Sequence, residues 1–113
     1  MKDNKLTILW TNDNPLTAEH MVFLYMRHVV TNNRFDDVTL IIWGATTKLT
    51  AENPHIQELV KEAQDNGVRV SACITCAEAL GVKDDIENLG IELIKWGAPL
   101  TELIKNEEHL LTI

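Results

Sequence analysis

The chain has few cysteines and no long apolar run, and each shortage excludes a class of protein. Its 113 residues include only two cysteines, three positions apart. Such a pair closes no long loop, and in a reducing compartment it more often serves redox, sulfur or metal chemistry than structure. No stretch approaches the ~20 apolar residues of a membrane span, and the first residues lack the apolar segment of a signal peptide. We therefore expect a cytoplasmic protein with no membrane partner.

Positive charge is also scarce. Ten Lys and Arg residues against 17 Asp and Glu residues give a formal net charge of -7. Because phosphate contacts need clustered basic side chains and these are scattered, we do not expect direct binding to nucleic acid. The chain has no glycine-rich phosphate loop, so we expect no nucleotide or other cofactor. A length of 113 residues fits a single domain with one core.

Short apolar runs alternate with helical patterns along the chain. Asn14-Pro15 and Asn53-Pro54 each join an N-cap residue to a proline that suits the first helical turn. Alternating strands and helices predict an α/β fold with three layers, α/β/α, around a five-stranded, mainly parallel sheet. The expected strands are residues 6–10, 38–43, 68–73, 91–96 and 109–113. The expected helices are residues 15–30, 54–66, 75–81, 82–89 and 99–105, with a loop over residues 44–52.

Three of the expected strands end in tryptophan and one ends in cysteine. In parallel sheets, ligands bind outside the carboxyl ends of the strands. We interpret this edge as a candidate substrate pocket beside the thiol, although any single tryptophan there is also explained as core. The expected lining is Trp10, Trp43, Gly44, Trp96 and Gly97, with residues 46–48 at its mouth.

Both cysteines lie where the third strand gives way to a helix. A thiol at such a junction faces unpaired N–H groups and the positive end of the helix dipole, which favour the nucleophilic thiolate. Thr75 and Glu78 form a capping-box pattern, which places Cys76 in the first helical turn. The choice of nucleophile stays open on these grounds. Cys76 is closer to the dipole but is opposed by Glu78, whereas the strand end directs Cys73 to the open edge.

The run from Gly67 to Gly81 resembles the central motif of the DsrE/DsrF-like sulfur-relay family. That motif has a glycine before the third strand, a cysteine at the end of the strand, a short helix and a closing glycine. The order of elements matches over nearly the whole chain, including the glycines of Trp43-Gly44 and Trp96-Gly97. The resemblance implies one DsrE-like domain over residues 1–113, assembled as a homotrimer or homohexamer.

The resemblance also implies an activity, that of a sulfurtransferase-like sulfur carrier. Cys73 is expected to accept sulfane sulfur as a persulfide from a donor protein and to pass it to a thiol of an acceptor protein. Cys76 is then either a resolving thiol or a small buried side chain. The chain departs from some stand-alone relatives at two positions: Ile74 replaces a glycine, and Leu80 replaces an arginine and so removes a possible cation.

Two other functions remain open: a non-enzymatic binding or assembly subunit with structural cysteines, and a Cys-x-x-Cys dithiol oxidoreductase. No metal site is predicted, because zinc needs two more ligands and the four histidines are scattered. His55 as a base for the thiol and Asp13 as a ligand contact are weaker candidates, since both suit ordinary helix starts and turns. The apolar run from Met21 to Met26 suits burial against a neighbouring subunit.

Overall fold

The computed structural model describes residues 4–113 and contains a five-stranded sheet in which every neighbouring pair of strands is parallel. Two predictions include residues 1–3: a single domain over residues 1–113 and the lack of a signal peptide. For these three residues, both predictions lie outside the described part of the chain. The strand order is β4-β3-β2-β1-β5. The strands are β1 (Lys5–Trp10), β2 (Asp37–Ile42), β3 (Arg69–Cys73), β4 (Glu92–Ile94) and β5 (Leu110–Thr112).

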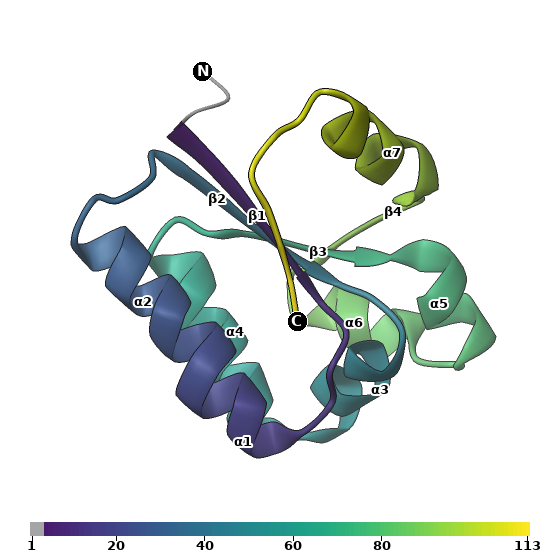
Figure 1. Ribbon diagram of the computed structural model, residues 1–113. Coiled ribbons are helices and arrows are strands. Elements are labelled where there is room, and N and C mark those ends of the chain that lie inside the picture. Colours follow the sequence, from purple (N-terminus) through teal and green to yellow (C-terminus); the bar gives the residue numbers. More distant parts are fainter. Residues whose placement is uncertain (1–3) are drawn as a thin grey trace.

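The helices cover the two faces of the sheet unequally, as Figure 1 shows. The first three crossovers all step in one direction along the sheet, so right-handed connections place their helices on one face. The last crossover returns across the sheet from β4 to β5 and places its helix on the opposite face. The three-layer α/β/α prediction is therefore confirmed. The helices are α1 (Pro15–Thr17), η2 (Ala18–Phe23), α2 (Leu24–Thr31), α3 (Ala45–Glu52), α4 (Pro54–Asp65), α5 (Ile74–Ala79), α6 (Lys83–Asn88) and α7 (Gly97–Lys105).

The main core lies between the sheet and the helices of the larger layer. Alternate residues of β1, β2 and β3 face this layer, since side chains along a strand point to opposite faces in turn. On α4, Ile56, Leu59, Val60 and Ala63 form the predicted apolar stripe and are buried. The largest fully buried side chains of this core include Ile8, Trp10, Val22, Met26, Leu40, Ile42 and Val60.

The two Asn-Pro signals are confirmed as helix starts. The side chain of Asn14 accepts hydrogen bonds from the backbone N–H groups of Leu16 (2.9 Å) and Thr17 (3.2 Å). The side chain of Asn53 caps α4 in the same way. Each cap satisfies N–H groups that have no partner within the helix, which explains why the chain turns at these points.

The predicted loop over residues 44–52 is wrong, because this segment forms α3. Its three threonines are β-branched and lower helix propensity, which hides the helix in the sequence. All three threonines are buried, and packing against α4, α5 and α6 stabilises the segment. Gly44 starts this helix at φ 72° and ψ -133°, a conformation open to glycine and costly for other residues.

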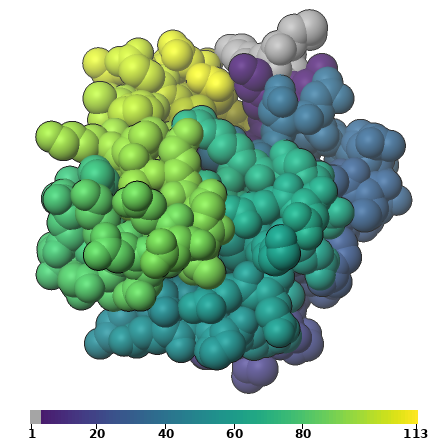
Figure 2. Space-filling view, turned by 180° about the vertical axis from the view of Figure 1, so that it is seen from behind, coloured from purple at the N-terminus to yellow at the C-terminus, as the bar shows by residue number. Residues whose placement is uncertain are grey.

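The region between β3 and β4 is flanked by helices from both layers. Seen from behind in Figure 2, the green segment that contains α5 and α6 and the yellow segment that contains α7 lie on one side of the molecule. The blue segment that contains α2 lies on the other side.

Candidate functional site

The topology marks one crevice at the carboxyl edge of the sheet. β3 and β4 are neighbours, with Cys73 paired to Ile94 at their ends. After β3 the chain turns to the larger helical layer, and after β4 it turns to α7 on the opposite face. Neighbouring strands whose connections leave to opposite faces create the crevice in which α/β proteins bind ligands. The fold therefore places Cys73 at this crevice.

The side chain of Cys73 is buried at this crevice. It is 4% exposed and forms a cluster with the buried Ile41 and Trp96. The half-buried side chains packed against this cluster are Leu9, Trp43, Cys76, Ile94 and Leu103. The expectation that the strand end directs Cys73 to an open edge is wrong, since the position is as predicted but apolar side chains cover the sulfur.

Trp96 is responsible for much of this cover. The predicted strand over residues 91–96 is shorter, because β4 ends at Ile94 and Trp96 adopts a helical backbone conformation at the start of α7. The indole Nε1–H donates to Ser71 Oγ at 2.8 Å, and the guanidinium of Arg69 lies 5.3 Å from the ring centroid. These contacts hold Trp96 under α7. Trp96 therefore lies on the same face of the sheet as the side chains of Ser71 and Cys73.

The three tryptophans do not surround one pocket. Trp10 is fully buried in the main core, where its ring meets Phe23 edge to face at 5.3 Å and Nε1–H donates to the Asn12 carbonyl. Trp43 is half-buried and packs against the Cys73 cluster with Trp96. Gly97 is the exposed first residue of α7. Of the residues predicted to line the pocket or its mouth, Gly44 and Lys48 border the cavity described next.

Cys76 opens onto a cavity of about 500 Å³ at the carboxyl edge, which we name the Cys76 pocket. Its polar lining is Cys76 itself with Asp13, Lys48 and Glu52. Its apolar lining is Gly44, Ala45, Leu49, Ala79 and Leu80. The half-buried Cys76 also touches the Cys73 cluster, so the two thiols connect this pocket to the crevice.

The local geometry at the cysteines differs from the capping-box prediction. Cys73, with an extended backbone at φ -74° and ψ 117°, is the N-cap of α5, and no side chain caps this helix. Thr75 is already helical, so its predicted N-cap role is wrong. Cys76 is the third residue of α5, and the first-turn N–H groups lack helical partners.

Three residues of α3 that line the pocket, Ala45, Leu49 and Glu52, were missed in the sequence, whereas Lys48 was expected at its mouth; all four had a recognisable signal. Once residues 45–52 are known to be helical, Ala45, Lys48, Leu49 and Glu52 share one face at the i, i+3, i+4 and i+7 spacing. Cys76, Ala79 and Leu80 repeat that spacing on α5. Helical periodicity therefore identifies the pocket-lining face of α3. It was not recognised because the threonine-rich composition of this segment does not predict a helix.

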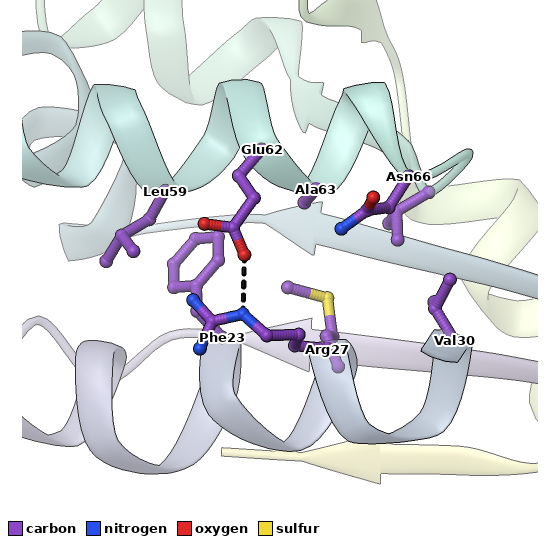
Figure 3. Close-up of a pocket in the computed structure, with 9 residues that line it drawn as sticks. Phe23, Arg27, Val30, Leu59, Glu62, Ala63 and Asn66 are labelled. Atoms are coloured by element: carbon purple, nitrogen blue, oxygen red, sulfur yellow. Dashed lines mark hydrogen bonds and ion pairs between the residues drawn. The ribbon is translucent and has the colours of Figure 1, made fainter. Parts of the chain in front are cut away.

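Two further depressions are less suited to chemistry. The cleft between α2 and α4 in Figure 3 has a volume of about 10 Å³, room for one water at most. Arg27 and Glu62 form an ion pair across it. A groove of about 490 Å³ on the α7 side of the sheet is lined by Lys5, Asp37 and Arg69, but by no cysteine.

His55 lies at the start of α4 and interacts with Glu19 of η2 rather than with a thiol. Its Nε2 is 3.0 Å from Glu19 Oε1. The hydrogen bond and the charge of Glu19 raise the pKa of His55 above its ordinary value of 6.5. The same hydrogen bond lowers the pKa of Glu19 below 4.5. The pair links η2 to α4 on the exposed surface.

We expect the contribution of this ion pair to stability to depend on pH. The raised pKa of His55 means that its contribution is complete below pH 6.5 and is lost as pH rises through the folded-state pKa. The lowered pKa of Glu19 means that its contribution is present above pH 4.5 and is lost at lower pH. His55→Gln should therefore lower the urea midpoint more at about pH 5.5 than at about pH 8.5. His28→Gln is the control, because the ring of His28 meets Asn32 rather than a carboxylate. Equal losses for His55→Gln at the two pH values would contradict the interpretation.

Neither a metal cluster nor a membrane span is present in the described part of the chain. Within residues 4–113, no three His, Cys, Asp or Glu side chains lie together as a metal site would require. No helix within the same residues is both long and apolar enough to cross a bilayer.

The fold and the site together define a parallel α/β protein with paired thiols at the carboxyl edge of its sheet. A family model described as the DsrE/DsrF-like family matches residues 6–113, so the chain belongs to this family, which is associated with sulfur relay. No curated protein matches the chain.

Two solved structures resemble the chain. One is a conserved protein of unknown function from Bacteroides thetaiotaomicron, BT1422. It is 39% identical, with 97% of this chain and 95% of that chain covered at a TM-score of 0.95. The other is a protein of unknown function from Methanobacterium thermoautotrophicum, MTH1491. It is 16% identical, with 98% of this chain and 100% of that chain covered at a TM-score of 0.73, a likeness of fold.

Proposed function

We propose that this protein is a sulfane-sulfur carrier in which Cys73 holds sulfur as a persulfide and Cys76 connects it to the surface. The observation that carries the proposal is the position of Cys76, which touches the Cys73 cluster on one side and lines a 500 Å³ pocket on the other. Both thiols are free. Membership of a family associated with sulfur relay supports the same chemistry.

The proposed transfer needs no oxidant or reductant. The Cys76 thiolate attacks the outer sulfur of a donor persulfide, the donor S–S bond breaks, and the donor leaves as a thiolate. The Cys73 thiolate then attacks the outer sulfur on Cys76 and takes it into the crevice. Burial beside Ile41 and Trp96 keeps water and stray thiols from the stored persulfide. An acceptor thiol removes the sulfur by the same steps in reverse.

The proposed carrier is cytoplasmic and exchanges sulfur with donor and acceptor proteins. We propose that it assembles as a homotrimer or homohexamer, as the family resemblance implies. The first helical segment supports assembly, because Met21, Leu24 and Tyr25 are large apolar side chains that remain exposed on it. Apolar side chains gathered on one exposed helix face favour contact with another protein surface.

Intact-mass measurement after incubation with a persulfide donor tests the carrier function. We expect the parent protein to gain one retained sulfur. Cys73→Ser should gain sulfur on Cys76 and lose it rapidly to added thiol, because that persulfide faces the open pocket. Cys76→Ser should gain sulfur slowly, because Cys73 is buried. The double variant should gain none. Sulfur retained by Cys73→Ser as long as by the parent would overturn the assignment of Cys73.

The burial of Cys73 also favours a second function, a non-enzymatic binding or assembly subunit with structural cysteines. Incubation with a persulfide donor distinguishes the two functions. For structural cysteines, neither thiol should gain sulfur, and the buried Cys73 should react only when the protein is unfolded. The dithiol oxidoreductase alternative predicts a Cys73–Cys76 disulfide that forms and breaks during turnover. Sulfur transfer with both thiols remaining reduced would count against it.

A further inference from the structure

The Cys76 pocket has features that indicate which molecule it accepts, if the carrier function proposed above holds. Its volume of about 500 Å³ lies in the range of ~300–1,000 Å³ typical of small-molecule sites. It lies between the β1–α1 loop, α3 and α5, so its walls come from three different connections at one edge. An organic molecule of amino-acid or dipeptide size fits such a cavity.

The pocket is lined by charged groups of both signs that are not paired with one another. Lys48 contributes one ammonium group, and Asp13 and Glu52 contribute two carboxylates. Across residues 4–113, none of the three forms an ion pair with another side chain. They are therefore free to bind a ligand that carries charges of both signs. A polyanion such as a nucleotide would meet two carboxylates and is disfavoured by them.

The thiol and the charged groups lie on facing elements. Cys76 and the exposed Leu80 come from α5, whereas Lys48 and Glu52 come from α3. The apolar side chains of Ala45, Leu49 and Ala79 complete the lining between them. A ligand held by its charged end at α3 would extend a short carbon chain and its sulfur across this apolar surface toward α5.

We propose that the Cys76 pocket binds a small zwitterionic hydropersulfide, R–S–SH, in which R bears one ammonium and one carboxylate group. The ligand carboxylate pairs with Lys48, and the ligand ammonium pairs with Asp13 and Glu52. The Cys76 thiolate attacks the terminal sulfur, the S–S bond to R breaks, and R–S⁻ leaves. The proton stays on the transferred sulfur, so Cys76–S–SH forms without any net oxidation or reduction. Lys48 thus supplies the cation of the pocket, and the exposed Leu80 contributes an apolar side chain on the α5 side.

Loading kinetics of the full chain with matched donors test this proposal. The probes are the hydropersulfides of cysteine, of cysteamine, which lacks the carboxylate, and of 3-mercaptopropionate, which lacks the ammonium, together with inorganic polysulfide. We expect cysteine hydropersulfide to load Cys76 fastest. Lys48→Met should slow that loading by about tenfold, since a charged pair contributes on the order of one such factor. The same substitution should slow loading by cysteamine hydropersulfide much less, because that donor has no carboxylate to pair with Lys48. Lys105→Met, at the end of α7 on the other face of the sheet, is the matched control.

A second measurement does not depend on sulfur transfer. S-methylcysteine keeps the two charges but has no sulfane sulfur, and it should protect Cys76 of the parent against alkylation. Lys48→Met and the double variant Asp13→Asn, Glu52→Gln should both lose this protection. If the parent is loaded equally by all donors and is not protected, the zwitterion site is wrong and the carrier function stands. If no donor loads the parent although S-methylcysteine protects it, the carrier function fails and the binding site stands.

Discussion

Replacement of Trp10 by alanine is expected to lower the free energy of unfolding by about 3–5 kcal/mol, the usual range for the loss of a large buried aromatic side chain. Trp10 is fully buried, and its ring meets Phe23 at 5.3 Å. The substitution also removes the indole N–H group, which donates a hydrogen bond of 2.9 Å to the Asn12 carbonyl. The side chain therefore ties the end of β1 to the helical layer and to the turn that leads into α1.

Urea or guanidinium unfolding, followed by far-UV circular dichroism, measures this effect. Trp10→Phe is the matched control, because it keeps most of the apolar volume and loses the hydrogen bond. We expect it to lose only about 1–2 kcal/mol. A loss below about 1.5 kcal/mol for Trp10→Ala would show that the site collapses around the cavity and that the ring contributes little to the core.

Replacement of Trp96 by alanine is expected to uncover Cys73 as well as to destabilise the fold. Trp96 is 3% exposed and packs against Cys73 and Ile41. Its loss should lower the free energy of unfolding by about 3–5 kcal/mol. The hydroxyl of Ser71 would keep its bond to the Glu92 carbonyl but would lose the indole donor. The crevice between β3 and β4 would then be open from the α7 side.

Alkylation of Cys73 in a Cys76→Ser background measures the opening directly. The labelling rate of the native protein should rise about 10²-fold with Trp96→Ala, since each 1.4 kcal/mol of opening energy is worth about tenfold. Trp96→Phe, which keeps an aromatic cover, should raise the rate much less. Unchanged labelling in the alanine variant would mean that Ile41 and the half-buried neighbours close the crevice without the indole.

The candidate site was predicted in position but not in accessibility. The position of Cys73 follows from local signals, because the apolar run before it and the helical pattern after it locate the end of β3 within the sequence. Its burial depends on Trp96, which lies after β4 at the start of α7 and packs back against β3. No local pattern reveals a contact between residues 23 positions apart.

The Cys76 pocket also could not be predicted from local sequence patterns alone. Each wall is a single face of a helix or loop, and the spacing on α3 and α5 identifies those faces once both segments are known to be helices. Which faces meet depends on the strand order, because the order places the ends of β1, β2 and β3 side by side. Asp13 becomes a neighbour of Cys76 only through that arrangement.

The sequence by itself determined the parallel α/β class, both Asn-capped helix starts and the two thiols at the end of the third strand. These features depend on hydrophobic period, capping chemistry and chain order, which act over a few residues. The tertiary structure alone decided that α7 covers the opposite face of the sheet, that Trp96 shields Cys73 and that Cys76 faces the pocket. These features depend on strand order and on side-chain packing between distant segments, which satisfy burial for the whole molecule at once.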